Sequence, residues 1–211
     1  MDVLVAAVPT RVRGRGMARH VAEHDAERGL VLITSAGGPP TLWQRAQSLV
    51  LRAFREELGP PDPAGTEAQL RRAYAAARGA LVRFREVLVG TSQPEVMLLA
   101  MLLGPARIGL IVGGAGRVYH HQVRQHRRLT AFEDLGGGLV ENPEPWVASA
   151  PVRRGDLLVA GSLEAFELPA IGTMAARLNE EPGVAVRTIA DLLLASPRET
   201  GVGAAAAVVR V

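Results

Sequence analysis

The sequence predicts an α+β protein in which antiparallel sheets are flanked by helices. Helical and strand patterns are both present, and the strand patterns follow one another instead of alternating with helices. Strict alternation would favour a parallel sheet, whereas strands grouped between pairs of helices favour antiparallel pairing. Because the 211 residues contain no Pro/Gly/Ser-rich linker, we expect one domain spanning residues 1–211.

Two amphipathic helices are predicted in the first half. T-x-x-Q patterns at Thr41 and Thr66 indicate threonine N-caps with a glutamine reaching back. Apolar residues then recur three and four apart as far as Leu58 and Leu88. Residues 59–65 are too few for anything but a turn, so these helices should pack antiparallel as one layer.

Strands and a second pair of helices account for most of the remaining chain. Four apolar segments between residues 96 and 130 are separated by short turns and predict an antiparallel meander. The predicted strands are 3–8, 96–103, 107–112, 117–122, 127–130, 156–160 and 204–211, and the later helices are 169–179 and 186–195.

Composition excludes several classes of protein. No apolar run approaches the ~18 residues of a membrane-spanning helix, so we expect a soluble protein with no membrane partner. The absence of cysteine excludes disulfides and thiolate metal sites and fits a cytoplasmic location. All basic residues are arginine, which is typical of a GC-rich genome. Acidic residues are interleaved with them, so nucleic acid is not an expected partner.

Four segments resemble the motifs of one enzyme family in the expected order. They are GLVLITSAGG at 29–38, GGAGRVY at 113–119, RGDLLVAGSLEA at 154–165 and the apolar stretch 202–211. These resemble the V-A-D-G-x-G-G, V-G-D-S-R-x-Y, P-G-D-x-L-L-L-x-S-D-G-L and D-N-strand motifs of type 2C (metal-dependent, PPM-type) serine/threonine protein phosphatases. The resemblance implies a four-layer α-β-β-α sandwich: two antiparallel sheets, each covered by a helix pair.

The acidic residues of those motifs are replaced in this chain. Thr34 and Ser35 stand for the first Asp-Gly pair, and Ala115, Leu163 and Val202 stand for the three later Asp residues. In the family such carboxylates hold two Mn or Mg ions. Mn and Mg prefer oxygen ligands, which Ala, Leu and Val do not supply. We therefore expect no metal, no cofactor and no catalytic residue, and interpret the chain as a bacterial pseudophosphatase that binds a protein partner in signalling.

An alternative interpretation is that the chain retains phosphatase activity. Asp25, Glu164 and Glu199 lie near the degenerate motifs, and a remodelled loop could return one of them to the cleft. The chain would then be a divergent Mn- or Mg-dependent phosphatase. For a single carboxylate such as Asp25, an ordinary surface role is the competing interpretation.

The hairpin predicted at 117–130 suggests two further sites. His120, His121 and His126 are potential transition-metal ligands, but adjacent strand residues point apart, so we favour a solvated hairpin. An anion or partner contact through its arginines competes with a plain charged edge that discourages aggregation. Those arginines are Arg117, Arg124, Arg127 and Arg128.

Overall fold

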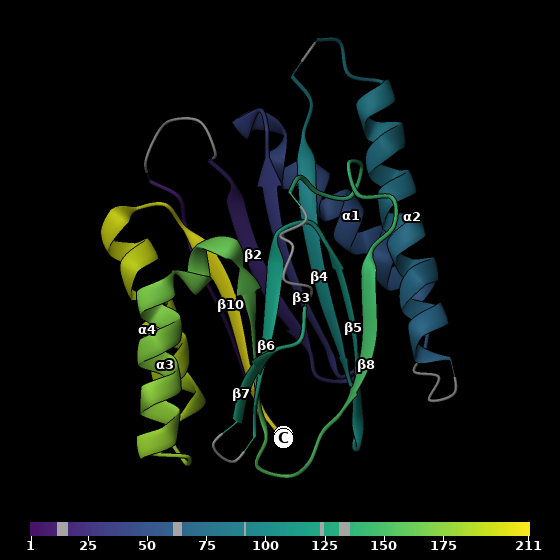
Figure 1. The fold of residues 1–211 in the computed structure, drawn as a ribbon. Helices are drawn as coiled ribbons and strands as arrows, with labels where there is room; N and C mark the ends of the chain where they lie inside the picture. The colour runs from purple at the N-terminus through teal and green to yellow at the C-terminus, as the bar shows by residue number, and fades with distance from the viewer. Residues whose placement is uncertain (12–16, 61–64, 91, 123–124, 131–135) are drawn as a thin grey trace.

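The computed structural model describes residues 1–11, 17–60, 65–90, 92–122, 125–130 and 136–211, and its four layers are visible in Figure 1. Sheet A has the strand order β1-β10-β9-β6-β7, and sheet B has the order β2-β3-β4-β5-β8. Every pairing is antiparallel. Sheet A comprises β1 (Asp2–Val8), β6 (Gly116–Gln122), β7 (Gln125–Arg128), β9 (Leu157–Ser162) and β10 (Ala204–Arg210). Sheet B comprises β2 (Arg19–Asp25), β3 (Leu30–Gly37), β4 (Glu95–Leu103), β5 (Arg107–Gly113) and β8 (Trp146–Pro151).

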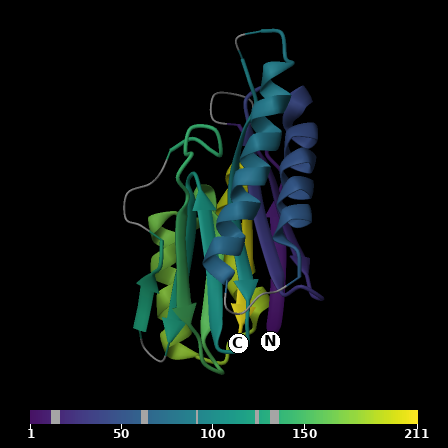
Figure 2. The ribbon, with the colours of Figure 1, turned by 90° about the vertical axis from the view of Figure 1, so that its right-hand side faces the viewer.

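Each sheet carries a helix pair on its outer face. The long helices α1 (Trp43–Leu58) and α2 (Thr66–Glu86) cover sheet B, as Figure 2 shows, while α3 (Leu168–Glu180) and α4 (Val186–Thr200) cover sheet A. Short 3-10 turns, η1 (Pro40–Leu42) and η2 (Leu163–Phe166), precede α1 and α3. The predicted α-β-β-α sandwich is therefore confirmed.

Three apolar clusters lie between the four layers. The two faces of each sheet contribute side chains to different clusters. On β3, Leu30 and Leu32 pack toward α1 and α2, whereas Val31 and Ile33 pack between the sheets. On β9, Leu157 and Val159 pack toward α3 and α4. Both faces of a central strand are thus buried, which explains the continuous apolar runs of β3, β4 and β10.

The predicted meander is wrong at one point. Strands β4 and β5 pair in sheet B and β6 and β7 pair in sheet A, so the chain crosses between the sheets after β5. Glycines permit the crossing. Gly114 has a φ of +103°, and a Cβ on Gly113 would overlap the ring and hydroxyl of Tyr74.

The predicted threonine caps are also wrong. Leu42 and Gly65 occupy the N-cap positions of α1 and α2, and neither helix has a side-chain cap. Gln69 instead donates its amide to the carbonyl of Leu58 at 2.5 Å and to that of Pro60 at 2.7 Å. This glutamine therefore joins the start of α2 to the end of α1.

Candidate functional site

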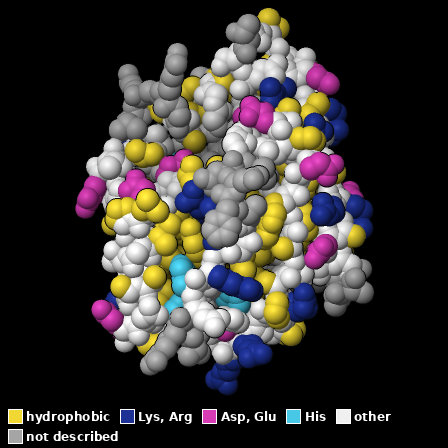
Figure 3. Space-filling view, viewed as in Figure 1, with side chains coloured by type: hydrophobic (Ala, Val, Ile, Leu, Met, Phe, Trp, Pro, Cys, Tyr) yellow, Lys and Arg dark blue, Asp and Glu magenta, His cyan; other side chains and the backbone are white. Residues whose placement is uncertain are grey.

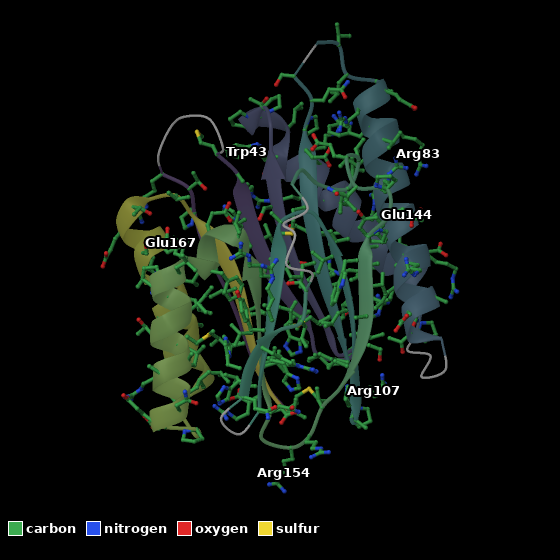
Figure 4. The ribbon with its side chains drawn as sticks, viewed as in Figure 1. Trp43, Arg83, Arg107, Glu144, Arg154 and Glu167 are labelled. Atoms are coloured by element: carbon green, nitrogen blue, oxygen red, sulfur yellow. The ribbon has the colours of Figure 1, made fainter. Side chains whose placement is uncertain are left out.

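A pocket of about 370 Å³ opens at one end of the sandwich. Strands β3 and β9 end there, and the chain crosses there from β5 to β6. The pocket lies at the end marked by Trp43 and Glu167 in Figure 4, away from Arg107 and Arg154. Its lining combines apolar, glycine and acidic residues: Met17, Ala18, Ser35, Gly37, Gly38, Glu95, Met97, Ala115, Gly137, Glu141, Ser162, Leu163 and Glu164. Three of the five degenerate positions, Ser35, Ala115 and Leu163, are therefore brought together.

Thr34 does not belong to this pocket. It is fully buried on the helix-facing side of β3, where its hydroxyl accepts a hydrogen bond from Gln47 of α1 at 3.1 Å. Ser35 lies on the opposite face, with Val31 and Ile33, and lines the pocket. Because side chains alternate along a strand, only Ser35 of the predicted pair lines the pocket, and the placement of Thr34 in the cleft is wrong.

Ser35 is paired with a histidine across the sheet. His20 is its register partner on β2, and its Nδ1 lies 2.8 Å from the Ser35 Oγ. The histidine is only 7% exposed, so burial lowers the pKa of His20, and the charge of Glu164 opposes that change. His20 is therefore neutral near pH 7.

Two carboxylates of the pocket come from segments that the motifs do not include. Glu95 begins β4, and its Oε1 accepts hydrogen bonds from the main-chain N–H groups of Val96 and Val140 at 3.2 and 3.0 Å. Its Oε2 accepts one from Arg85 at 2.6 Å. Burial nevertheless raises the pKa of Glu95. Glu141 is exposed at the pocket rim. Nothing in the local sequence marks either residue.

The three residual acids predicted from sequence lie in different places. Glu164, in η2, lines the pocket, and its buried Oε2 has no hydrogen-bond partner within the described structure. Asp25 pairs with Leu30, five residues along β3 from Ser35, which is about 16 Å. It accepts a hydrogen bond from the N–H of Arg28 at 3.1 Å. Glu199 is exposed near the end of α4. Neither Asp25 nor Glu199 lines the pocket.

Val202 also falls outside the residues that line the pocket. It follows α4 with 38% of its surface exposed, and its carbonyl accepts a hydrogen bond from the Thr10 hydroxyl at 2.8 Å. Leu163 and Ala115 thus remain as the apolar replacements that face the cleft.

The arginines of the predicted hairpin do not form one patch. Arg117 is half-buried and donates to the carbonyl of Phe166 at 3.4 Å, and Arg128 donates to the Thr130 hydroxyl at 3.0 Å. Arg127 pairs with His120, and so lies on the opposite face of the ribbon from Arg117 and Arg128. Arg124 lies outside the described residues. Of the two interpretations drawn from the sequence, one contact surface or a plain charged edge, this separation of Arg127 from Arg117 and Arg128 does not favour the single contact surface.

The interpretation of the histidines as solvated is wrong. His120 is 1% exposed, and its Nε2 lies 2.9 Å from the Asp156 carboxylate. His121 is also buried and pairs across the ribbon with His126, which stacks on Tyr119 with ring centroids 5.1 Å apart. Burial lowers the pKa of both His121 and His126. Figure 3 shows histidine side chains in the lower part of this face, where the β6–β7 ribbon lies in Figure 1.

The side chains of the pocket do not fit a pair of divalent metal ions. Among the described residues, no group of three or more His, Cys, Asp or Glu is arranged to hold a metal. Glu95 already accepts three hydrogen bonds, and the walls between the carboxylates carry Ala115 and Leu163, which have no donor atom.

Within the described part of the chain, no helix is long and apolar enough to cross a membrane.

No protein-family model and no curated protein matches this chain in sequence. Its fold is similar to solved bacterial phosphatases. One is the Mycobacterium tuberculosis serine/threonine phosphatase PstP/Ppp (18% identity, TM-score 0.75), covering 99% of this chain and 98% of the other. A second is a bacterial serine phosphatase (10% identity, TM-score 0.78), and the match covers 100% of this chain and 98% of the other. A third is the PPM Ser-Thr phosphatase MsPP from Mycobacterium smegmatis (15% identity, TM-score 0.68), and this match also covers 100% of this chain and 98% of the other.

The catalytic domain of PstP is known in complex with two manganese ions. At these identities the likeness establishes the fold. The chain has the fold of PPM-type serine/threonine phosphatases over nearly its whole length.

Proposed function

We propose that this chain is a pseudophosphatase: a PPM-like scaffold without metal-dependent phosphatase activity that acts as a binding or regulatory module for a protein partner. One observation carries the proposal. At the end of the sandwich, Ala115 and Leu163 face the pocket where the resemblance places metal-binding aspartates. A dinuclear site needs oxygen ligands to hold the ions that activate water and offset the charge of the phosphate.

Phosphatase assays test the loss of activity directly. The full chain is assayed with Mn or Mg on p-nitrophenyl phosphate and on a phosphothreonine peptide, beside an active metal-dependent phosphatase of the same fold. We expect no turnover above buffer for this chain. Metal-dependent turnover that follows the protein through purification would overturn the proposal.

Thermal unfolding tests the metal site without an activity readout. A metal bound to the folded state at 100 times its Kd stabilises that state by about 2.7 kcal/mol. We expect Mn titration to leave the Tm of this chain unchanged. An Ala115→Asp, Leu163→Asp variant restores two carboxylates at the pocket and should gain an upward shift with Mn.

The alternative is a divergent phosphatase with a remodelled Mn or Mg site, and Glu164 is the observation that favours it. Its buried Oε2 has no hydrogen-bond partner in the described structure and belongs to a pocket-lining residue. If Mn-dependent turnover is found, Glu164→Gln should abolish it. Glu199→Gln serves as the matched control, because Glu199 is exposed and does not line the pocket.

Exposed apolar side chains in η2 and at the start of α3 support the proposed protein partner. Leu163 is 36% exposed and Leu168, at the start of α3, is 84% exposed. Such side chains are used in protein contacts when they lie together on a surface. Affinity capture from the native organism should retrieve a partner with the wild-type chain and lose it with Leu163→Glu. Val87→Glu, at the exposed end of α2, should leave capture unchanged. Equal loss with both variants would argue against a contact at the pocket.

A further inference from the structure

Ser35 and His20 form a nucleophile and base pair that phosphatase chemistry does not use. They are register partners on β2 and β3, so both side chains project between the sheets. The Ser35 Oγ and the His20 Nδ1 lie 2.8 Å apart, within the reach at which an imidazole removes a hydroxyl proton. Ser35 is half-buried and lines the pocket, so its Oγ can meet a bound molecule.

We propose that Ser35 is a nucleophile activated by His20 and that the pocket accepts an uncharged carboxylic ester, whose acyl group is transferred to the Ser35 Oγ and then to water. This inference does not rest on the pseudophosphatase proposal, since it concerns a different reaction at a different group.

His20 is in the state that a general base requires. Burial lowers the pKa of His20, so the imidazole is neutral near pH 7 and has a lone pair available to accept a proton. When His20 accepts the proton, the resulting imidazolium is stabilised by the negative charge of Glu164, which already acts to raise its pKa.

The strand leaves a path to the Ser35 hydroxyl. Gly37 lies two residues further along β3 and therefore on the same face as Ser35. Apart from the chain neighbours of Gly37, no described residue has a heavy atom within 4 Å of the place where a Cβ on Gly37 would stand, so the described structure leaves this part of the pocket open. The apolar walls near it include Met97 and Leu163. A volume of about 370 Å³ accommodates a short acyl or aryl group.

Charge selects the class of ester. The described lining contains Glu95, Glu141 and Glu164 and no arginine. A phosphate monoester carries close to two negative charges at pH 7 and is disfavoured beside these carboxylates. An uncharged carboxylic ester meets no such repulsion, and its acyl or alkyl part gains from contact with the apolar walls.

The reaction balances with water as the only co-reactant. The Ser35 Oγ forms a bond to the carbonyl carbon while its proton passes to the His20 Nδ1. The C–O bond to the alcohol then breaks, and the leaving alkoxide takes that proton. Water attacks the acyl-serine, giving one proton through His20 back to the Ser35 Oγ and releasing the carboxylic acid. Ester and water thus yield acid and alcohol.

The first experiment uses the full wild-type chain without added metal. It is treated with an uncharged fluorophosphonate probe, and separately assayed for hydrolysis of p-nitrophenyl acetate and p-nitrophenyl butyrate. We expect one adduct per chain, mapped by peptide mass spectrometry to Ser35, and ester turnover above buffer. A folded chain, verified by circular dichroism, that gives neither adduct nor turnover overturns the proposal. An adduct on another residue does so as well.

Matched variants then locate the activity. Ser35→Ala should lose the adduct, and His20→Gln should slow hydrolysis by about 100-fold or more, the usual contribution of a general base. Ser149→Ala is the control, because Ser149 lies on edge strand β8 and its hydroxyl contacts Arg107 at 3.1 Å. Hydrolysis that Ser35→Ala or His20→Gln leaves unchanged would contradict the inference.

Gly37→Leu tests access without touching either reacting group. The open space at Gly37 accommodates a side chain, so the fold should be kept, and the new side chain should block the approach to Ser35. We expect butyrate hydrolysis to fall further than acetate hydrolysis. Because this variant leaves Ser35 and His20 in place, it also decides the question if Ser35→Ala fails to fold. Unaltered turnover of both esters would show that Ser35 is not the reacting group.

Discussion

The carboxylates at the two ends of β9 differ in how well their oxygens are hydrogen-bonded. Asp156, just before the strand, is 7% exposed, and its Oδ2 lies 2.9 Å from donors of His120, Gln122 and the main chain of Arg153. Beyond the other end, Leu163 stands where the motif that this segment resembles has an acid, and Glu164 has a buried oxygen with no partner in the described structure. One end of β9 thus has a carboxylate that joins neighbouring segments by hydrogen bonds, whereas the other has a carboxylate with an unsatisfied oxygen.

Replacing Asp156 should have the largest effect on stability. Asp156→Ala removes an acceptor shared by buried His120, half-buried Gln122 and the main chain of exposed Arg153, and it leaves the His120 nitrogen without this partner. We expect a loss of about 2–4 kcal/mol in the free energy of unfolding, measured by urea denaturation. Asp191→Ala, which removes an exposed carboxylate paired with Arg198, is the control and should cost far less. Similar losses in both would remove the contrast between the two ends of β9.

Acid should weaken the same cluster in a defined range of pH. Burial opposes ionisation of Asp156, but the hydrogen bonds from Gln122, Arg153 and His120 outweigh it and hold its pKa below the ordinary 3.8. A lowered folded-state pKa gives a stabilisation that is complete above the unfolded pKa and is lost as pH falls through the folded one. The difference in unfolding free energy between wild type and Asp156→Ala should therefore be constant from about pH 5 to 7 and shrink below about 3.8. A difference that shrinks already near pH 6 would point to a histidine instead.

Glu164→Leu should have a much smaller effect, and its sign is informative. The substitution removes a buried oxygen that has no hydrogen-bond partner in the described structure, so little favourable interaction is lost. We expect unfolding free energies within about 0.5 kcal/mol of wild type, or a gain of up to about 1 kcal/mol. Thermal and urea unfolding both measure this. A loss above about 2 kcal/mol would mean that Glu164 is structurally equivalent to Asp156.

The smallest expected effect belongs to an exposed ion pair on α3. Arg177 and Glu181 lie 2.6 Å apart, yet both side chains are about half exposed. Water and salt screen such pairs, so Glu181→Gln should change the unfolding free energy by less than about 0.5 kcal/mol. The result sets the baseline against which both ends of β9 are compared.

Repeating patterns in the sequence predicted the helices and many of the strands, and the family resemblance supplied their arrangement in four layers. The periodicities of α1, α2 and β4 lie in residues next to one another in the chain, and packing agrees with them. The crossing at Gly113 and Gly114 was missed, because a glycine-rich turn looks the same whether its strands pair or separate. Edge strand β8, with a Ser and terminal Pro151 in six residues, gave too weak a pattern to be predicted.

The pocket was predicted less completely, for reasons of register and distance along the chain. The motif comparison selected both Thr34 and Ser35, but a strand reverses its faces at each residue, and only Ser35 faces the pocket. Glu95 and Glu141 reach the pocket from segments without motifs, so only the tertiary fold reveals them. Likewise, the approach of His20 to Ser35 depends on pairing between β2 and β3.

The position of β10 sets the order in which the molecule can be completed. Strand β1 lies at the edge of sheet A, and its neighbour there is β10, roughly 200 residues later in the chain. At ribosomal speeds of about 5–20 residues per second, β1 therefore waits some ~10–40 s for this neighbour to be synthesised. During that interval β1 lacks the strand that pairs with it in the finished sheet, and unpaired strand edges of this kind favour non-native pairing.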